Sequence, residues 1–132
     1  MEPIELTKVQ TARIRKNQGI NESWSPLISA TTAIKAADLQ DHDEVYVDPD
    51  AGKNGIIPIL SDNEAHRLSR TILNAGSGGR TLQLTLPNEI LAPLGVTRDE
   101  IDSDDPPELA IYASDEGALA IERCNKQTIT IP

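Results

Sequence analysis

The sequence predicts a mostly β domain with short helices, built from two ββαββ repeats within one chain of 132 residues. Short runs of alternating polar and apolar residues, separated by Gly, Pro and Asn turns, are typical of half-buried strands. The sign of the charge alternates twice along the chain, and a segment of the first half resembles one that lies 56 residues later. Such internal similarity at a fixed spacing indicates a duplicated unit.

The charge distribution is the first observation that bears on function. The net charge is -9, but residues 6–37 carry +4 and residues 63–98 carry +2, whereas residues 38–62 carry -6 and residues 99–122 carry -9. The net charge alone argues against a nucleic-acid partner, and its distribution leaves two basic stretches that could face phosphate. An acid-rich, Lys-poor composition with few aromatic residues is also typical of proteins that work in a high-salt cytoplasm, such as that of a halophilic archaeon.

The duplication sets the expected domain organisation. Residues 28–36 align without a gap with residues 84–92. We therefore predict a single domain with a degenerate first repeat at 6–61, a second repeat at 64–123 and a short tail at 124–132. Each repeat alone offers too little apolar surface to fold independently, so the two are expected to share one core.

The first repeat is expected to contain two strands, a short helix and a hairpin. Thr31 or Thr32 is expected to cap the helix, because Thr side chains accept hydrogen bonds from the first turn. Pro58 is expected at a sheet edge or a bulge, since it cannot donate to a central ladder. The predicted elements are a strand over 8–15, a turn over 16–19, a strand over 25–29, a helix over 33–37, and a hairpin over 44–48 and 55–60.

The second repeat shows the same order with clearer local chemistry. Pro87 suits the first turn of a helix, and Gly95 suits the left-handed residue that ends it. Ile90, Leu91 and Leu94 form the apolar face between them. The predicted elements are a strand over 67–73, a turn over 76–79, a strand over 81–86, this short helix, and a hairpin over 108–113 and 118–122.

Residues 84–101 carry a resemblance to a known family. The sequence LTLPNEILAPLGVTRDEI resembles the core motif of AbrB/MazE/SpoVT-type transcription regulators: a strand, a Pro, a short helix ending in Leu-Gly-aliphatic, and an acidic step into another strand. The resemblance is specific over residues 80–123 and weak over 8–61. The Gly usual before the acidic residue is replaced by Arg98 and, in the first repeat, by His42; Leu39 stands where the helix-ending Gly would fall.

The resemblance implies a fold and a function. Family members are usually dimers whose chains interlace, so two repeats in one chain imply a cradle-loop, swapped-hairpin AbrB-like β-barrel formed as a pseudo-dimer. A double-psi β-barrel, as in the amino-terminal domains of archaeal AAA ATPases, is the alternative. The implied function is a DNA-binding transcriptional regulator, with double-stranded DNA as the partner and a homodimer or a partner protein as further expectations.

The candidate DNA-binding residues are basic side chains of the two opening hairpins, which we expect to lie side by side and form one basic face while the acidic hairpins point elsewhere. Arginine suits this role because its planar fork holds a phosphate or a guanine edge through two hydrogen bonds. A non-catalytic interaction or adaptor barrel, in which these residues are solvated strand positions, is the alternative. The candidates are Lys8, Arg13, Arg15 and Lys16 in the first hairpin and Arg67, Arg70 and Arg80 in the second.

Other functional classes find little support in the sequence. An enzyme or ligand-binding barrel would need a pocket that no residue cluster indicates, so we predict no enzymatic activity, no small-molecule substrate and no cofactor. The single cysteine, Cys124, excludes an intramolecular disulfide and a Cys-based zinc site. Residues 41–43 (Asp-His-Asp) are interpreted as a solvated turn and not a metal site, and Trp24 as a core or barrel-end residue. No membrane segment or signal peptide is expected, which predicts a cytoplasmic protein.

Overall fold

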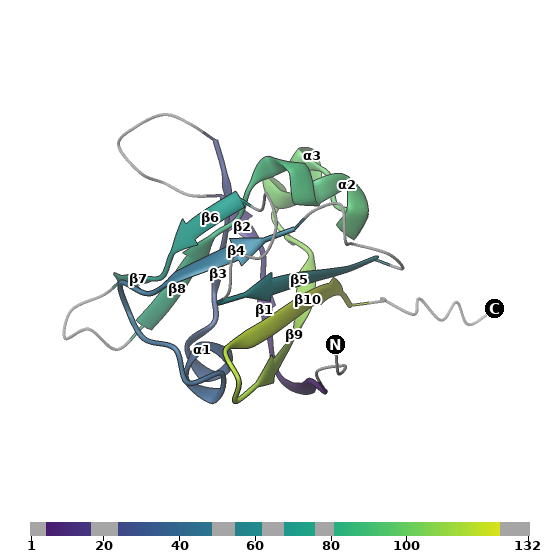
Figure 1. Cartoon of the computed structure of the whole chain (residues 1–132). Coiled ribbons are helices and arrows are strands. Elements are labelled where there is room, and N and C mark those ends of the chain that lie inside the picture. The colour runs from purple at the N-terminus through teal and green to yellow at the C-terminus, as the bar shows by residue number, and fades with distance from the viewer. Residues whose placement is uncertain (1–4, 17–23, 49–54, 62–67, 76–80, 125–132) are drawn as a thin grey trace.

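A computed structural model describes residues 5–16, 24–48, 55–61, 68–75 and 81–124. The protein is mostly β, with two antiparallel sheets and several short helices, as the sequence predicts (Figure 1). None of the helices in these ranges has the length and the apolar character that a membrane crossing requires.

The larger sheet has six strands in the order β1-β9-β10-β5-β4-β6. Its inward-facing side chains, among them Val47, Ile57, Ile111 and Ile121, are buried in one hydrophobic cluster that draws on both halves of the chain. The strands are β1 (Thr7–Arg13), β4 (Glu44–Val47), β5 (Ile56–Leu60), β6 (Leu68–Thr71), β9 (Glu108–Ser114) and β10 (Ala118–Arg123).

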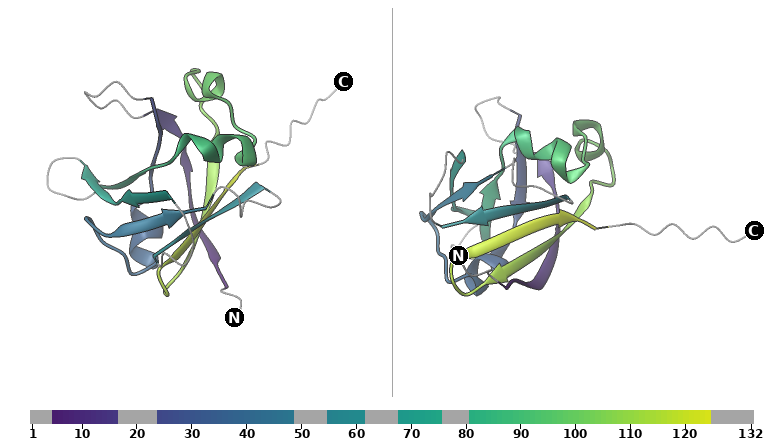
Figure 2. Two further views of the ribbon diagram at one scale, coloured as in Figure 1. Left: turned by 45° about the horizontal axis from the view of Figure 1, so that its top comes forward. Right: turned by 45° about the vertical axis from the view of Figure 1, so that its right-hand side comes forward.

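The smaller sheet has four strands in the order β2-β3-β8-β7. Ile28 and Leu84 face each other at its centre and are 2% and 1% exposed, so this sheet lies against the same core. Figures 1 and 2 show it beside the larger sheet. Its strands are β2 (Arg15–Lys16), β3 (Pro26–Ser29), β7 (Leu73–Ala75) and β8 (Thr81–Thr85).

The two halves contain corresponding strands, β1 to β5 and β6 to β10. When each strand is replaced by its counterpart, both strand orders read the same. Strand β1 pairs with β9 of the other half, and β6 pairs with β4 in the same way. The two strand pairs at the centres, β3·β8 and β5·β10, each join one half to the other. Matching hydrogen bonds run from the Ala30 N–H to the Leu82 carbonyl (3.0 Å) and from the Leu86 N–H to the Pro26 carbonyl (2.8 Å). The described chain therefore has an approximate internal twofold arrangement.

The described strands form two separate sheets and do not close into the barrel that the sequence predicts. The opening strand of each half breaks at an isoleucine, Ile14 between β1 and β2 and Ile72 between β6 and β7, and continues in the other sheet. At these breaks the Ile14 N–H bonds to the Pro107 carbonyl (3.0 Å) and the Ile72 N–H to the Asp43 carbonyl (2.9 Å). Because both isoleucines are fully buried, the breaks turn the chain around the core and leave two separate ladders.

Short helices lie at two ends of the sheets, α1 (Thr31–Ala36) at one end and η3 (Asn88–Ile90), α2 (Leu91–Leu94) and α3 (Arg98–Ile101) at the other (Figure 1). Ile90, Leu91 and Leu94 are buried, which confirms the predicted apolar face. Gly95 follows α2 with a φ of 74°, as expected for a left-handed end residue.

Several local expectations about the helices are wrong. Thr31 does not cap α1: its Oγ1 accepts the Leu82 N–H (2.9 Å), and Gln10 of β1 accepts the Ala33 N–H of the first turn (2.8 Å). Pro87 precedes a 3₁₀ turn in an extended conformation, because the helix begins one residue later. Asp38, not Leu39, takes the left-handed position after α1, with a φ of 59°.

Pro58 does not lie at a sheet edge, because β5 sits between β10 and β4. It pairs with Ala120, and its carbonyl accepts the Asp48 N–H (3.5 Å) just past the end of β4. In an antiparallel strand the N–H and C=O of one residue point to the same side. The absent N–H of Pro58 therefore falls where β4 has ended, and no β4 residue loses a partner.

Candidate nucleic-acid interface

The opening hairpins of the two halves lie side by side in the four-stranded sheet, as expected. Strand β3 of the first hairpin pairs directly with β8 of the second. The register places Arg15, Leu27 and Thr85 in one row on the outer face, opposite to the face that buries Ile28 and Leu84. The outer face is therefore a surface shared by both hairpins.

Arg15 and Lys16 form β2 at one edge of this sheet. Both side chains are exposed, and among the described residues neither takes part in an ion pair. Both cations are therefore available to an external anion.

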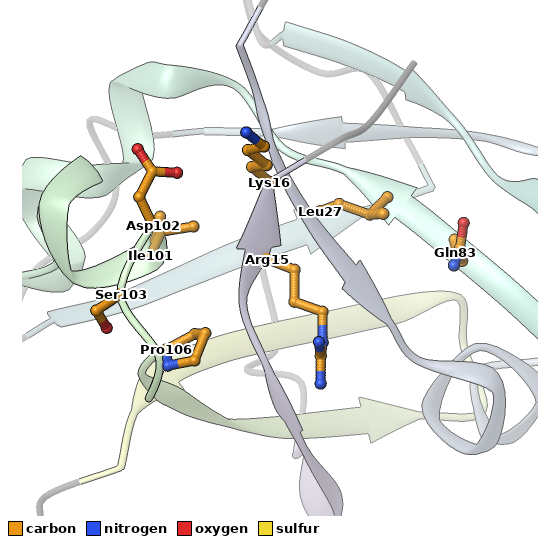
Figure 3. A pocket seen from close by; sticks show the side chains of 8 residues that line it. All are labelled: Arg15, Lys16, Leu27, Gln83, Ile101, Asp102, Ser103 and Pro106. Atoms are coloured by element: carbon orange, nitrogen blue, oxygen red, sulfur yellow. The ribbon is translucent and has the colours of Figure 1, made fainter.

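A hollow of about 580 Å³ lies on this edge of the sheet. Figure 3 shows β2 running between the sheet residue Gln83 on one side and the residues that follow α3 on the other. Its lining combines two cations, one carboxylate, polar groups and a small apolar area, which suits a charged and solvated ligand better than an apolar one. The lining residues are Arg15, Lys16, Leu27, Gln83, Ile101, Asp102, Ser103 and Pro106.

Arg13 is held within the protein. Its Nη1 donates to Asp105 Oδ1 (2.6 Å) and to the Pro106 carbonyl (2.7 Å). It also faces Glu108 across the β1·β9 pair, so it belongs to the other sheet from Arg15 and Lys16. The candidate phosphate-binding side chain of Arg13 is therefore already paired with Asp105.

The structure does not gather the remaining candidates at the hollow. Lys8 is exposed near the start of β1, opposite Tyr112, and Arg70 lies on β6 at the far edge of the larger sheet. The Arg70 guanidinium donates to the Ser69 carbonyl (2.7 Å). Arg67 and Arg80 lie outside the described residues. The single basic face expected from the sequence is therefore reduced, in the described part of the chain, to Arg15 and Lys16.

The acidic residues between α3 and β9 lie beside the first basic hairpin, a contact that the charge distribution along the sequence does not predict. Asp102 lines the same hollow as Arg15 and Lys16, and Asp105 binds Arg13. We call residues 102–105 the acidic segment. Its four residues are exposed, including those that face the cations.

Local hydrogen bonds position the acidic segment. Thr97 and Glu100 form a capping box at the start of α3, in which each side chain accepts the other residue's N–H. Ser103 Oγ then donates to the Glu100 carbonyl (2.6 Å) and accepts the Asp105 N–H (3.3 Å). The chain is thereby turned back toward β9 directly after α3.

Arg123 of β10 anchors α3 from the other side. Its Nη2 lies 2.5 Å from Glu100 Oε2 and its Nη1 lies 3.1 Å from Glu100 Oε1, and Nη1 also donates to the Gly95 carbonyl. The hydrogen bond from Arg123 is the main cause that lowers the pKa of Glu100 below its ordinary value. Glu100 is therefore a structural anion that holds α3 against the sheet.

Trp24 connects the acidic segment to the first hairpin. Its Nε1–H donates to Asp102 Oδ1 (3.3 Å), and the Arg98 guanidinium lies 4.3 Å from the centre of its ring. The ring is partly buried against the core cluster, and Trp24 lies just before β3, as expected. Trp24 thus ties the first hairpin to the α3 region of the second half.

Cys124 and His42, the other side chains that could be reactive or bind a metal, do not form a site with the residues described. Burial is the first cause that raises the pKa of the Cys124 thiol, which disfavours a reactive thiolate. His42 is exposed and lies 3.4 Å from Asp41, with a left-handed φ of 71°. Within the ranges that the structure describes, His, Cys, Asp and Glu side chains do not gather in a group of three that could hold a metal ion.

Sequence reasoning missed α3 and the contribution of Gln83, Asp102 and Ser103 to the hollow. The signal for α3 was present in Thr97-Arg98-Asp99-Glu100, because Thr followed three residues later by Glu is the pattern of a capping box. The position of the acidic segment against the first hairpin had no comparable signal, since it depends on a contact between the two halves.

Comparison of the chain with protein-family models, with curated proteins and with solved structures finds no match.

Proposed function

We propose that the protein is a DNA-binding transcriptional regulator of the AbrB-like type and that the outer face of its four-stranded sheet is the surface that meets DNA. The observation that carries the proposal is the pairing of the two opening hairpins in one sheet, with Arg15 and Lys16 exposed at its edge. Cations of this kind neutralise phosphate and position a protein on a duplex.

The strand exchange between the halves supports the finer fold that belongs to this proposal. In a swapped-hairpin arrangement the opening strand of one unit pairs with the other unit, and here β1 pairs with β9 and β6 with β4. The cradle-loop architecture would then be formed within a single chain. The breaks at Ile14 and Ile72 are the places where each opening strand crosses from one sheet to the other.

The charge of the protein sets how the proposed binding would depend on salt. Because the net charge is -9, long-range repulsion opposes the approach of DNA and only local contacts favour it. Each phosphate contact releases counterions, so log K should fall with log salt by about 0.9 for each contact. Arg15 and Lys16 together would account for about two units of this slope.

The test is fluorescence anisotropy with labelled genomic duplexes, including the region upstream of the protein's own gene, across a salt series. The variant Arg15→Gln/Lys16→Gln should bind more weakly and lower the slope by about two. Lys35→Gln, at an exposed position in the last turn of α1, is the control for loss of an exposed cation outside β2 and should keep the wild-type slope. Wild-type protein that binds no duplex at low salt, or a double variant with an unchanged slope, would overturn the proposal.

A non-catalytic interaction domain is a second candidate, and the outer face of the larger sheet favours it. Ile56 is 41% exposed there, and Pro58 and Leu60 on the same strand are half-buried. A second copy or a partner protein could cover this apolar strip. Sedimentation equilibrium of the wild type and of Ile56→Glu would test self-association through this face.

A further inference from the structure

We propose that the acidic segment is an internal competitor for DNA phosphate: in the free protein Asp105 pairs with Arg13 and Asp102 lies at the hollow lined by Arg15 and Lys16, and both carboxylates move away when DNA binds. This inference rests on the proposed DNA-binding function and deepens it, because it adds regulation at the same site. Asp102 and Asp105 then act as determinants of affinity, although neither would touch DNA.

The contacts place carboxylates beside the candidate phosphate-binding cations. Asp105 Oδ1 is 2.6 Å from Arg13 Nη1, a distance typical of a charge-assisted hydrogen bond. Asp102 lines the hollow that also contains Arg15 and Lys16 (Figure 3). One carboxylate is therefore paired with the last cation of β1, and another lies at the hollow beside the two cations of β2.

The interaction is weak enough to be exchanged. The side chains of Arg13 and Asp105 are 39% and 59% exposed, and exposed ion pairs contribute little because solvent screens them. Among the described residues, the Asp102 carboxylate accepts one hydrogen bond, from Trp24 Nε1 at 3.3 Å. A dense array of phosphates can therefore compete with these two contacts.

The anchors of the neighbouring structure do not depend on these contacts. The capping box of Thr97 and Glu100 and the ion pair between Glu100 and Arg123 keep α3 in place. Release of the acidic segment would thus be a local movement of residues 102–105 between α3 and β9, with the sheets unchanged.

The test compares two double variants with the same change in charge. Asp102→Asn/Asp105→Asn removes both carboxylates from the basic hairpin. Asp115→Asn/Glu116→Gln removes two exposed carboxylates from the turn between β9 and β10, separated from the acidic segment by the length of β9, about 20 Å. Affinities for one labelled duplex are measured by anisotropy at several salt concentrations, with circular dichroism to confirm folding.

We expect the Asp102/Asp105 variant to bind more tightly than the control, by up to about fivefold for each contact removed, since an exposed pair contributes at most about that factor. The difference should shrink as salt rises. Equal affinities of the two variants would show a general charge effect and overturn the inference while the proposed function stands. Absence of binding by the wild type and both variants at every salt concentration would instead overturn the proposed function and, with it, this inference.

A second measurement uses the unmodified protein. Trp24 is the only tryptophan, so the indole N–H that donates to Asp102 gives a single NMR signal. Titration with duplex DNA should shift this signal as Asp102 leaves. A saturated complex in which the signal keeps its free position would overturn the inference, whatever the variants do.

Discussion

Truncation of Leu84 is the sharpest test of how the two halves share a core. Leu84 is 1% exposed on the inner face of the four-stranded sheet, opposite Ile28 of the other half. Leu→Ala removes three carbons, and at about 0.8 kcal/mol each the transfer contribution is about 2.4 kcal/mol. The cavity left behind adds to this, so Leu84→Ala should lower the free energy of unfolding by about 3 kcal/mol.

Leu73 provides a matched control in the same sheet. It is 44% exposed and lies on β7 in the outer row with Gln83, so Leu73→Ala leaves no enclosed cavity. We expect its cost to stay below about 1 kcal/mol. Urea unfolding measures both variants, with Trp24 fluorescence reporting the contact between the first hairpin and the α3 region, and far-ultraviolet circular dichroism reporting the whole chain.

Two outcomes would refute this reasoning. A cost for Leu84→Ala no larger than the cost for Leu73→Ala would contradict the assignment of Leu84 to the inner face, and a reversed order would indicate a one-residue shift in register. Fluorescence and circular dichroism transitions with different midpoints would mean that the halves unfold separately, contrary to a shared core.

Two further predictions follow from local geometry. Gly117→Ala should destabilise the protein by about 1–3 kcal/mol, and thermal melts should show a larger effect than for Gly95→Ala. Both glycines have a positive φ. Of the two, only Gly117 would place the new Cβ against another residue, with Ser61 Oγ at 2.5 Å. Glu100→Gln should cost less than about 1 kcal/mol at pH 7, because Glu100 and Arg123 are both partly exposed. Because folding lowers the pKa of Glu100, its stabilisation is full above the ordinary value of 4.5 and is lost as the pH falls through the lowered pKa. The unfolding free energies of wild type and variant should therefore converge in acid. A difference that stays constant with pH would contradict this.

The strands were predictable because most of them have one buried face. Residues 81–85 alternate between half-buried and buried positions, as the polar and apolar alternation of the sequence indicates. Positions that tertiary contacts decide were not predictable. Thr31 bonds to Leu82 of the other half, and Gln10 takes its place at the start of α1, so local capping preference was overridden.

The candidate site was predictable only in its basic half. The run of cations over residues 8–16 identified the hairpin, but the break at Ile14 divides that run between two sheets. Arg13 therefore faces Asp105, whereas Arg15 and Lys16 face the hollow. A charge count along the chain contains no information about this division, because it depends on a single buried residue that turns the strand.

The asymmetry of the site follows from one difference between otherwise matching halves. Ile14 bonds to Pro107, and its counterpart Ile72 bonds to Asp43, so the chain before β9 and the chain before β4 occupy equivalent places. In the first half only a short turn leads from α1 to this point, whereas in the second half α3 and the acidic segment intervene. The additional residues reach the hairpin of the first half alone. The twofold arrangement would make the interface symmetric, but this additional segment contacts the first hairpin, and the variants of Asp102 and Asp105 test whether that contact affects DNA binding.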